Sequence, residues 1–168
     1  MAKLKDLLTA RRGRRSTAAL LLALVLAAGA GAAAWYAHDE SHRRDVAVRQ
    51  SLAAAPAAAQ AIFSYDYRSF DASTSNARAF ITGDFAAEYA KTTAALKSNA
   101  VAEQAIVRAE VSATGVVTAS AQSVDLLLYV NQYRRNTNIT GEKVDQNRVV
   151  LTMVPADGTW KVSHAVAL

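Results

Sequence analysis

The chain has 168 residues, a formal net charge of +5 and no cysteine, which excludes disulfide frameworks, thiol nucleophiles and zinc sites built on thiolates. Residues 1–17 hold six lysines and arginines against one aspartate, whereas residues 38–168 hold 13 charges of each sign. The bulk of the chain therefore has no electrostatic reason to bind nucleic acid, and its length suits one ordinary domain.

A run of 20 residues without charge, 18–37, follows this basic cytoplasmic tail, 1–17. At about 1.5 Å per residue, a helix of this length just crosses a hydrocarbon core of roughly 30 Å. The cations before it and the Trp35-Tyr36 pair near its end are typical of a membrane anchor with its amino terminus in the cytoplasm. The alternative is a cleaved signal peptide, because Ala30-Gly31-Ala32 fits a small-residue cleavage site. The run exceeds the usual apolar core of a signal peptide, so we predict an uncleaved transmembrane helix at 18–37 and a C-terminal domain outside the cell membrane.

Small residues recur every four positions along this segment, at Ala19, Ala23, Ala27 and Gly31. Such a stripe lets a second transmembrane helix approach closely, so we predict that it contacts a partner helix. Alanine supplies 38 of the 168 residues, so the alternative is that the stripe reflects composition. The basic tail sets the topology or, in addition, binds the headgroups of anionic membrane lipids.

Residues 38–59 are predicted to form a helical stalk or linker. They begin strongly charged and end almost entirely in alanine around Pro56. We expect Pro56 to interrupt or start the helix, because a proline inside a helix loses a hydrogen bond and clashes with the preceding turn. His38 and His42 have the spacing of a zinc-binding helix, but the third ligand and the cleft are missing, so no metal site is predicted.

From residue 60 the pattern becomes that of a packed domain, 60–168, which opens with three helices. The first has Ile62, Phe63, Tyr67 and Phe70 on one side at about 100° per residue. Capping oxygens of Asp71, Ser73 and Thr74 predict the start of the second helix. Gly83 is expected to stop it, and Asp84 to cap a third helix whose shared face carries Phe85, Tyr89 and Leu96.

After Asn99 the hydrophobic period changes to two, which indicates three or four antiparallel strands near 105–114, 123–135, 148–154 and 160–167. Gly115 is expected at a turn or bulge, and residues 136–143 form a polar loop. Asp157-Gly158 predicts a hairpin, since this pair accepts the positive φ angles of a type I′ turn. The fold class is therefore α+β, a cone-like domain in which a curved antiparallel sheet wraps around about three helices.

Asp66 lies between Ile62 and Phe70 on the helical wheel, so its carboxylate is expected to point inward. A buried carboxylate has a raised pKa and can act as a base when suitable partners are near; the chain offers Tyr65, Tyr67, Tyr129 and His164. We prefer the alternative, in which Asp66 accepts hydrogen bonds from backbone N–H groups, a tyrosine or an arginine and ties elements together. No nucleophile elbow, phosphate loop or dinucleotide fingerprint occurs in the sequence, so no catalytic residue and no cofactor are predicted.

Several stretches of the domain occur in a fixed order, namely Ser64-Tyr65-Asp66-Tyr67-Arg68 with Asp71, Thr82-Gly83-Asp84-Phe85 with Tyr89, Val130-Asn131-Gln132, Arg148-Val149-Val150-Leu151-Thr152-Met153, and Asp157-Gly158-Thr159-Trp160-Lys161-Val162-Ser163. Together they resemble the Mce-associated membrane proteins of actinobacteria. The resemblance covers residues 60–166, together with the preceding anchor.

The resemblance implies a non-enzymatic, single-pass accessory subunit that stabilises or assembles an Mce-type system for importing lipids or sterols. Its implied partners are an integral membrane permease and secreted lipid-binding subunits. It also implies a fold of the nuclear-transport-factor/ketosteroid-isomerase type, with a fold-defining rather than catalytic role for Tyr65, Asp66, Tyr67, Arg68, Gly83 and Trp160.

The sequence leaves three further hypotheses open. The first is a scaffold subunit of a type IV secretion or conjugation machine, which also places a cone domain after one membrane helix. The second is an enzyme of the isomerase or dehydratase kind. The third is a carrier that holds a lipid in the cone, which a deep and apolar cavity would favour.

Overall fold

The computed structural model describes the backbone of residues 2–168 and the side chains of residue 24 and residues 26–168. The chain divides into two compact units, Met1–His42 and Arg43–Leu168, and helix α1 (Ala2–Phe63) contributes to both. Each unit is described by itself below.

The first unit consists of helix α1 alone. Its described side chains include large exposed apolar groups, namely Leu24, Leu26, Trp35 and Tyr36. Among the residues whose side chains the structure describes, no helix is both long and apolar enough to cross a membrane. The predicted span 18–37 lies partly outside these residues, and Ala19 and Ala23 lie outside them altogether; Ala27 and Gly31 are exposed.

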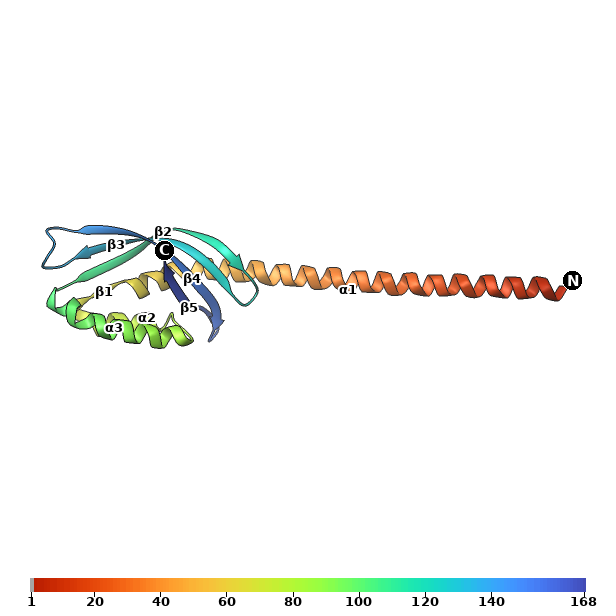
Figure 1. Cartoon of the computed structure of the whole chain (residues 1–168), viewed down its shortest axis with the longest axis horizontal. Helices are drawn as coiled ribbons and strands as arrows, with labels where there is room; N and C mark the ends of the chain where they lie inside the picture. The colour runs from red at the N-terminus through yellow and green to blue at the C-terminus, as the bar shows by residue number, and fades with distance from the viewer. Residues whose placement is uncertain (1) are drawn as a thin grey trace. The chain divides into compact units, whose positions relative to one another are not determined.

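The second unit continues from α1 with short elements, two helices and long strands (Figure 1). In chain order these are β1 (Tyr65–Asp66), the 3₁₀ helix η1 (Tyr67–Ser69), α2 (Phe70–Arg78), α3 (Asp84–Ala102), β2 (Ile106–Ala119), β3 (Val124–Arg135), β4 (Lys143–Ala156) and β5 (Thr159–Ala167). The strands form one sheet in the order β1-β2-β3-β4-β5, and every neighbouring pair is antiparallel.

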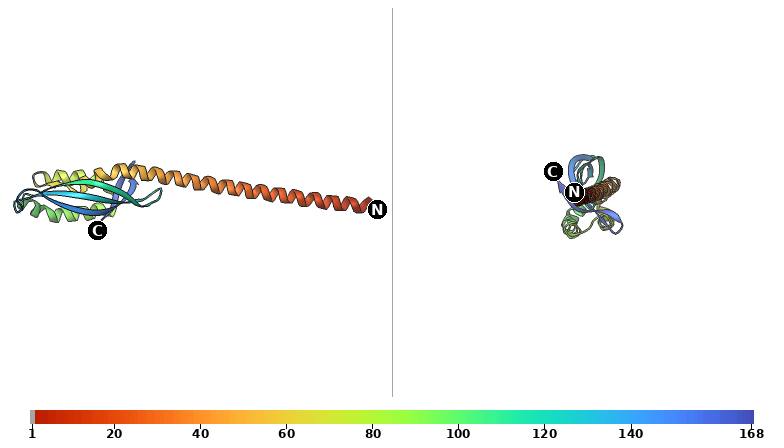
Figure 2. Two further views of the ribbon diagram at one scale, coloured as in Figure 1. Left: turned by 90° about the horizontal axis from the view of Figure 1, so that it is seen from above. Right: turned by 90° about the vertical axis from the view of Figure 1, so that its right-hand side faces the viewer.

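This arrangement confirms the predicted α+β cone. In the unit Arg43–Leu168 the sheet curves over α2 and α3, and the last turns of α1 run between the sheet and these helices (Figures 1 and 2). The sheet therefore has an inner face toward the helices and an outer face that no helix of this unit covers. The two-residue strand β1 was not predicted from the sequence, because a segment this short shows no period.

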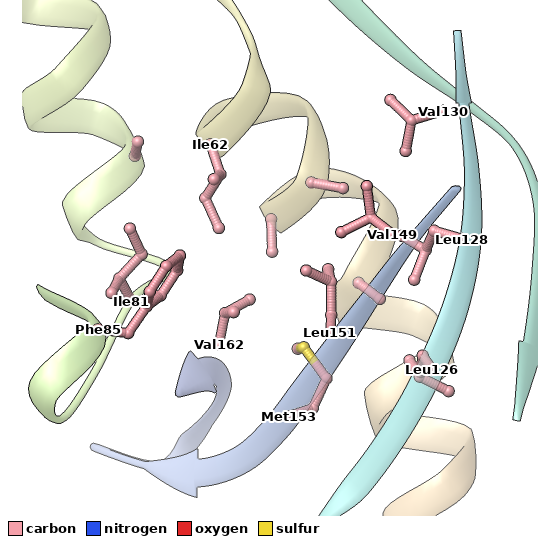
Figure 3. Packing of buried hydrophobic residues seen from close by; sticks show 14 of the residues in the cluster. Ile62, Ile81, Phe85, Leu126, Leu128, Val130, Val149, Leu151, Met153 and Val162 are labelled. Atoms are coloured by element: carbon pink, nitrogen blue, oxygen red, sulfur yellow. The ribbon is translucent and has the colours of Figure 1, made fainter. Parts of the chain in front are cut away.

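The core lies on the inner face and follows from strand alternation. Val124, Leu126, Leu128 and Val130 of β3 are all at most 1% exposed, as expected for alternate residues that face one side of a sheet. They meet buried residues of the other elements (Figure 3), namely Leu151 and Met153 of β4, Val162 of β5 and Ile62 of α1. Helices and sheet thus share one continuous core.

The end of α1 belongs to this core, which differs from the predicted stalk. Small residues at Ala47, Ser51, Ala55 and Ala58 are almost fully buried, and their spacing of three or four places them on one side of the helix. The alanines on this side belong to the same core cluster as the buried residues of the sheet. The predicted boundary at residue 60 is therefore too late, and the compact unit begins at Arg43.

Pro56 does not interrupt the helix, contrary to prediction. It lies inside α1 and is exposed. The proline ring therefore lies on the solvent side of the helix, and the buried stripe continues past it through Ala58.

The predicted helix over Ile62–Phe70 is also wrong, because α1 ends at Phe63. Tyr65 and Asp66 pair with Val107 and Ile106 of β2 instead. The Asp66 carboxylate accepts a hydrogen bond from the Arg68 backbone N–H and so caps η1. Local capping and strand pairing outweigh the helical apolar period here.

The turns are largely as predicted. Asp157 and Gly158 have φ angles of 52° and 76°, which confirms the type I′ hairpin between β4 and β5. Gly83 has a φ of 65° and is itself the N-cap of α3, so Asp84 is the first helical residue rather than the cap. Gly115 lies within β2, and the bulges fall on either side of it, between Val111 and Ala113 and between Val116 and Thr118.

Candidate functional site

The motif Tyr65–Arg68 is held by an ion pair between its second and fourth residues. The Arg68 guanidinium donates to the two Asp66 carboxylate oxygens at 2.6 to 3.2 Å. This pairing holds the pKa of Asp66 below its ordinary value of 3.8. The prediction of an inward carboxylate is wrong, since Asp66 is partly exposed, and its lowered pKa opposes a role as a base at neutral pH. The preferred alternative is confirmed in part: Asp66 accepts hydrogen bonds from an arginine and from a backbone N–H, but both belong to Arg68, two residues on, and do not tie the first helix to its neighbours.

The other residues of the predicted fold-defining set also make structural contacts. Tyr65 packs edge-on against Phe70, with ring centroids 5.5 Å apart. The Trp160 indole N–H donates to the Gln50 side-chain oxygen at 2.8 Å and so joins β5 to α1. These contacts agree with a role in the fold.

The residues considered for catalysis do not come together. Asp66 lies on β1 at one edge of the sheet, and Tyr129 lies on the outer face of β3. His164 is exposed on β5, opposite Thr152. Within the described residues there is no group of three or more histidine, aspartate or glutamate side chains placed to hold a metal ion.

A cavity of about 360 Å³ opens between the helices and the inner face of the sheet. Its walls are mainly apolar and come from the end of α1, from α2 and α3, and from β4 and β5. The main apolar lining residues are Ile62, Phe70, Phe85, Tyr89, Leu96 and Val149. This volume is at the lower end of the range for small-molecule sites in proteins.

Two polar side chains of the cavity lining close the end of α1. The Tyr89 hydroxyl donates to the Ile62 carbonyl at 3.5 Å, and the Gln132 amide donates to the Phe63 carbonyl at 3.2 Å. Asn147 in turn donates to the Gln132 side-chain oxygen at 2.8 Å. The last carbonyls of a helix have no partner within it, so these side chains satisfy them. Burial raises the pKa of Tyr89 above 10.0, which keeps its hydroxyl protonated.

An apolar strip crosses the outer face of the sheet. It consists of Leu127, Tyr129, Val150 and Val166, which we call the outer-face strip. Leu127 pairs with Val150, and Val150 pairs with Val166, so the three lie in one row across β3, β4 and β5. Tyr129 and Val166 are 46% and 42% exposed. On the β2 side the row meets Gly115 and Ala113, which are too small to cover it.

A hollow of about 350 Å³ lies beside Tyr129 and is rimmed by polar groups, namely Ser112, Asn131, Gln146, Asn147 and Arg148. Arg148 pairs directly across from Tyr129. In the described part of the chain Arg148 has no carboxylate partner. An exposed tyrosine next to such an arginine is the composition that protein interfaces favour.

The sequence analysis did not identify this strip, although one signal was present. In the run Val124–Val130 the even-numbered residues face the core. Leu127 is apolar as well, although alternation places it on the outer face. An apolar residue out of phase in an antiparallel strand indicates a second buried or contacting face. The strands that flank it had to be placed before the strip could be recognised.

Comparison of the sequence with protein-family models found no match. A comparison with curated proteins likewise found no match.

Solved structures do share the fold. An IcmL-like type IV secretion system protein from Legionella pneumophila matches with a TM-score of 0.58 and 15% identity, over 69% of this chain and 88% of that one. CagV, a VirB8 homolog of the type IV secretion system of Helicobacter pylori, matches with a TM-score of 0.56 and 13% identity, over 68% and 96%. A protein from Novosphingobium aromaticivorans provisionally named scytalone dehydratase matches with a TM-score of 0.51 and 14% identity, over 73% and 83%. At these identities the likeness is one of fold.

Proposed function

We propose that the chain is a non-enzymatic, membrane-anchored scaffold subunit of a multiprotein machine in the cell envelope, of the type IV secretion or conjugation kind. The observation that carries the proposal is the outer-face strip with Arg148 beside it. A sheet face that no helix of the unit covers, and that presents leucine, tyrosine and valine side chains in register, gains stability when a partner protein covers it.

Two of the fold neighbours support a secretion role over lipid import. The IcmL-like protein and CagV are both assigned to type IV secretion systems, and each is covered over most of its length. We infer that this chain uses the same domain form to brace other proteins.

The chemistry of the cavity supports a non-enzymatic role. Its described lining has one carboxylate, Glu88, and no histidine, lysine or arginine. An acid–base mechanism needs titratable groups poised near the reacting atoms, but Glu88 is exposed and burial raises the pKa values of Tyr65 and Tyr89 above 10.0. The polar side chains Tyr89 and Gln132 are engaged with the end of α1, so they act in the fold.

The proposed membrane anchor lies in the residues that precede the domain. The uncharged run 18–37 has the length of a membrane span, and the basic residues precede it. We infer from this order an amino terminus in the cytoplasm and a unit Arg43–Leu168 on the outer side of the cell membrane.

A second candidate is the accessory subunit of an Mce-type lipid or sterol import system. The sequence resemblance over residues 60–166 favours it, and it requires the same anchor and a similar docking surface. The two candidates differ in their partners: components of a secretion machine in the first, a permease and secreted lipid-binding subunits in the second.

Affinity purification of the tagged full-length protein from its own cells, followed by identification of the bound proteins, tests the proposal. The expected result is recovery of secretion or conjugation components with the native chain. Recovery of a permease with lipid-binding subunits would replace the first candidate by the second. Recovery of no envelope protein, together with turnover of a small molecule, would contradict both.

A matched pair of variants tests whether the bound proteins contact the outer-face strip. Tyr129→Lys adds a cation within the strip, whereas Gln122→Lys adds one at an exposed polar residue of the turn between β2 and β3, outside both the strip and the hollow. The bound proteins should be lost from the first variant and retained by the second, at equal membrane levels. Equal retention of the bound proteins by both variants would show that the outer-face strip does not hold them.

A further inference from the structure

The cavity exists because β5 contributes only methyl groups to its wall. Ala165 and Ala167 line the cavity together with Phe85 and Tyr89 of α3, and Val149 of β4 pairs with Ala167. Larger side chains at the two alanine positions would fill this space. The aromatic rings opposite are rigid and buried, since Phe85 and Tyr89 are 9% and 8% exposed. The space is therefore bounded by stiff walls and suits a flat apolar guest.

The electrostatics of the lining oppose negative charge. Glu88 lies exposed on the rim, and the described lining includes no lysine or arginine. The carbonyl end of α1, at Ile62 and Phe63, forms part of the wall, and a helix carries partial negative charge at this end. An anionic group brought into the cavity would meet two sources of repulsion and no counter-ion.

Two cations stand near the aromatic lining without belonging to it. Burial raises the pKa values of Tyr89 and Tyr65. The charges of Arg78 and Arg134 oppose this rise, at Tyr89 and Tyr65 respectively. Arg134 pairs with Asp145 at 2.9 Å, and Lys143 contacts the same carboxylate at 3.4 Å. Neither arginine lines the cavity.

The wall also offers a hydrogen-bond donor to a neutral guest. The Gln132 amide carries two N–H groups, of which one donates to the Phe63 carbonyl. Its oxygen already accepts from Asn147. The remaining N–H can donate to a hydroxyl or ketone oxygen of a bound molecule.

We propose that the cavity of the cone is a binding site for an uncharged, flat apolar molecule with one hydroxyl or ketone oxygen, and that it discriminates against carboxylates of the same shape. The site goes beyond the scaffold role and lies on the opposite face of the sheet from the outer-face strip. Loss of either site therefore leaves the other measurable.

Equilibrium dialysis of the purified full-length protein against naphthol and naphthoate tests the proposal. The two probes share a ring system, and at neutral pH the first is uncharged and the second is an anion. The same medium without protein gives the blank for partitioning. Naphthol should bind with at least about tenfold higher affinity than naphthoate, because charge burial without a partner is costly.

Three variants locate the binding. Ala167→Phe fills the mouth, and Val166→Phe adds the same ring to the other face of the same strand. The first should weaken naphthol binding by about tenfold or more, and the second should leave it within about twofold. Glu88→Lys, at an exposed rim position, should raise the affinity for naphthoate by about tenfold and leave naphthol nearly unchanged.

Thermal melts of each variant confirm that it folds before dialysis. Should Ala167→Phe fail to fold, Ala165→Leu replaces it with a smaller added volume. Equal binding of naphthol and naphthoate by the native chain would overturn the charge argument. Unaltered naphthol binding by the folded filling variant would overturn the site itself.

Discussion

The buried hydroxyl of Ser51 gives a sharp prediction about stability. Ser51 is 0% exposed, and its Oγ has no hydrogen-bond partner among the described residues. It lies on the same stripe of α1 as Ala47 and Ala55, where alanine is evidently accommodated. We predict that Ser51→Ala stabilises the unit Arg43–Leu168, although it removes a polar group from the helix.

The magnitude follows from two contributions. A buried, unsatisfied hydroxyl costs about 1–3 kcal/mol of desolvation, and the substitution removes this cost. Alanine also exceeds serine in helix propensity by roughly 0.5 kcal/mol. The small void left by one oxygen offsets part of this gain through lost contacts. The free energy of unfolding should therefore rise by about 1–2 kcal/mol, which corresponds to a Tm increase of roughly 3–10 °C for a unit of this size.

Thermal and urea unfolding of the full-length protein measure this change. Ser98→Ala is the matched control, because Ser98 is exposed on α3 and reports helix propensity without burial. The control should gain no more than about 0.5 kcal/mol. A lower Tm for Ser51→Ala, or a gain equal to that of the control, would refute the reasoning that the hydroxyl is unsatisfied.

Further predictions concern the motif, the end of α1 and the hairpin. Asp66→Asn should destabilise the fold by about 1 kcal/mol or less, because its partner Arg68 is exposed and surface pairs contribute little. The Asp66 contribution is fully present above its unfolded pKa of 3.8 and is lost as pH falls through the lower folded pKa, so the Tm difference between native chain and variant should shrink in acid; a constant difference would contradict this. Gln132→Leu should cost about 2–4 kcal/mol in urea unfolding, since it leaves a helix carbonyl and the Asn147 amide unpartnered, and a cost under about 1 kcal/mol would count against the capping role. Gly158→Ala should cost about 1 kcal/mol from backbone strain alone, because φ is 76° and an added Cβ meets no atom within 4 Å; an unchanged Tm would show that the turn relaxes.

The strands could be predicted from the sequence because their residues alternate. Val107 and Ala109 of β2 face the core, and Arg108 and Glu110 next to them are exposed, so period two was visible without any partner. The Asp157-Gly158 turn was equally local, since positive φ angles at two successive positions restrict the residue types. Features set by one strand or one turn need no tertiary information.

The junction at Phe63 could not be predicted in the same way. Ile62, Phe63, Tyr67 and Phe70 have a helical period, yet the helix ends where Tyr65 finds a partner in Val107 of β2. That partner lies 42 positions later in the chain, so a strand pairing distant in sequence overrides the local period.

The functional surfaces were hidden for a related reason. The outer-face strip depends on the register that places Leu127 beside Val150 and Val150 beside Val166. The cavity depends on Ala165 and Ala167 facing α3, which an alanine-rich sequence does not distinguish from other alanines. Both surfaces exist only once separate elements have been paired.

Site-specific photo-crosslinking in living cells tests the central claim most directly. A photoreactive phenylalanine analogue is placed at Tyr129, within the outer-face strip, or at Ser98, which is exposed on α3 away from it. A docked scaffold subunit should form a discrete crosslink to another envelope protein from position 129 and none from position 98. The absence of a crosslink from position 129, or equal crosslinking from both positions, would contradict the proposal that this sheet face holds a partner.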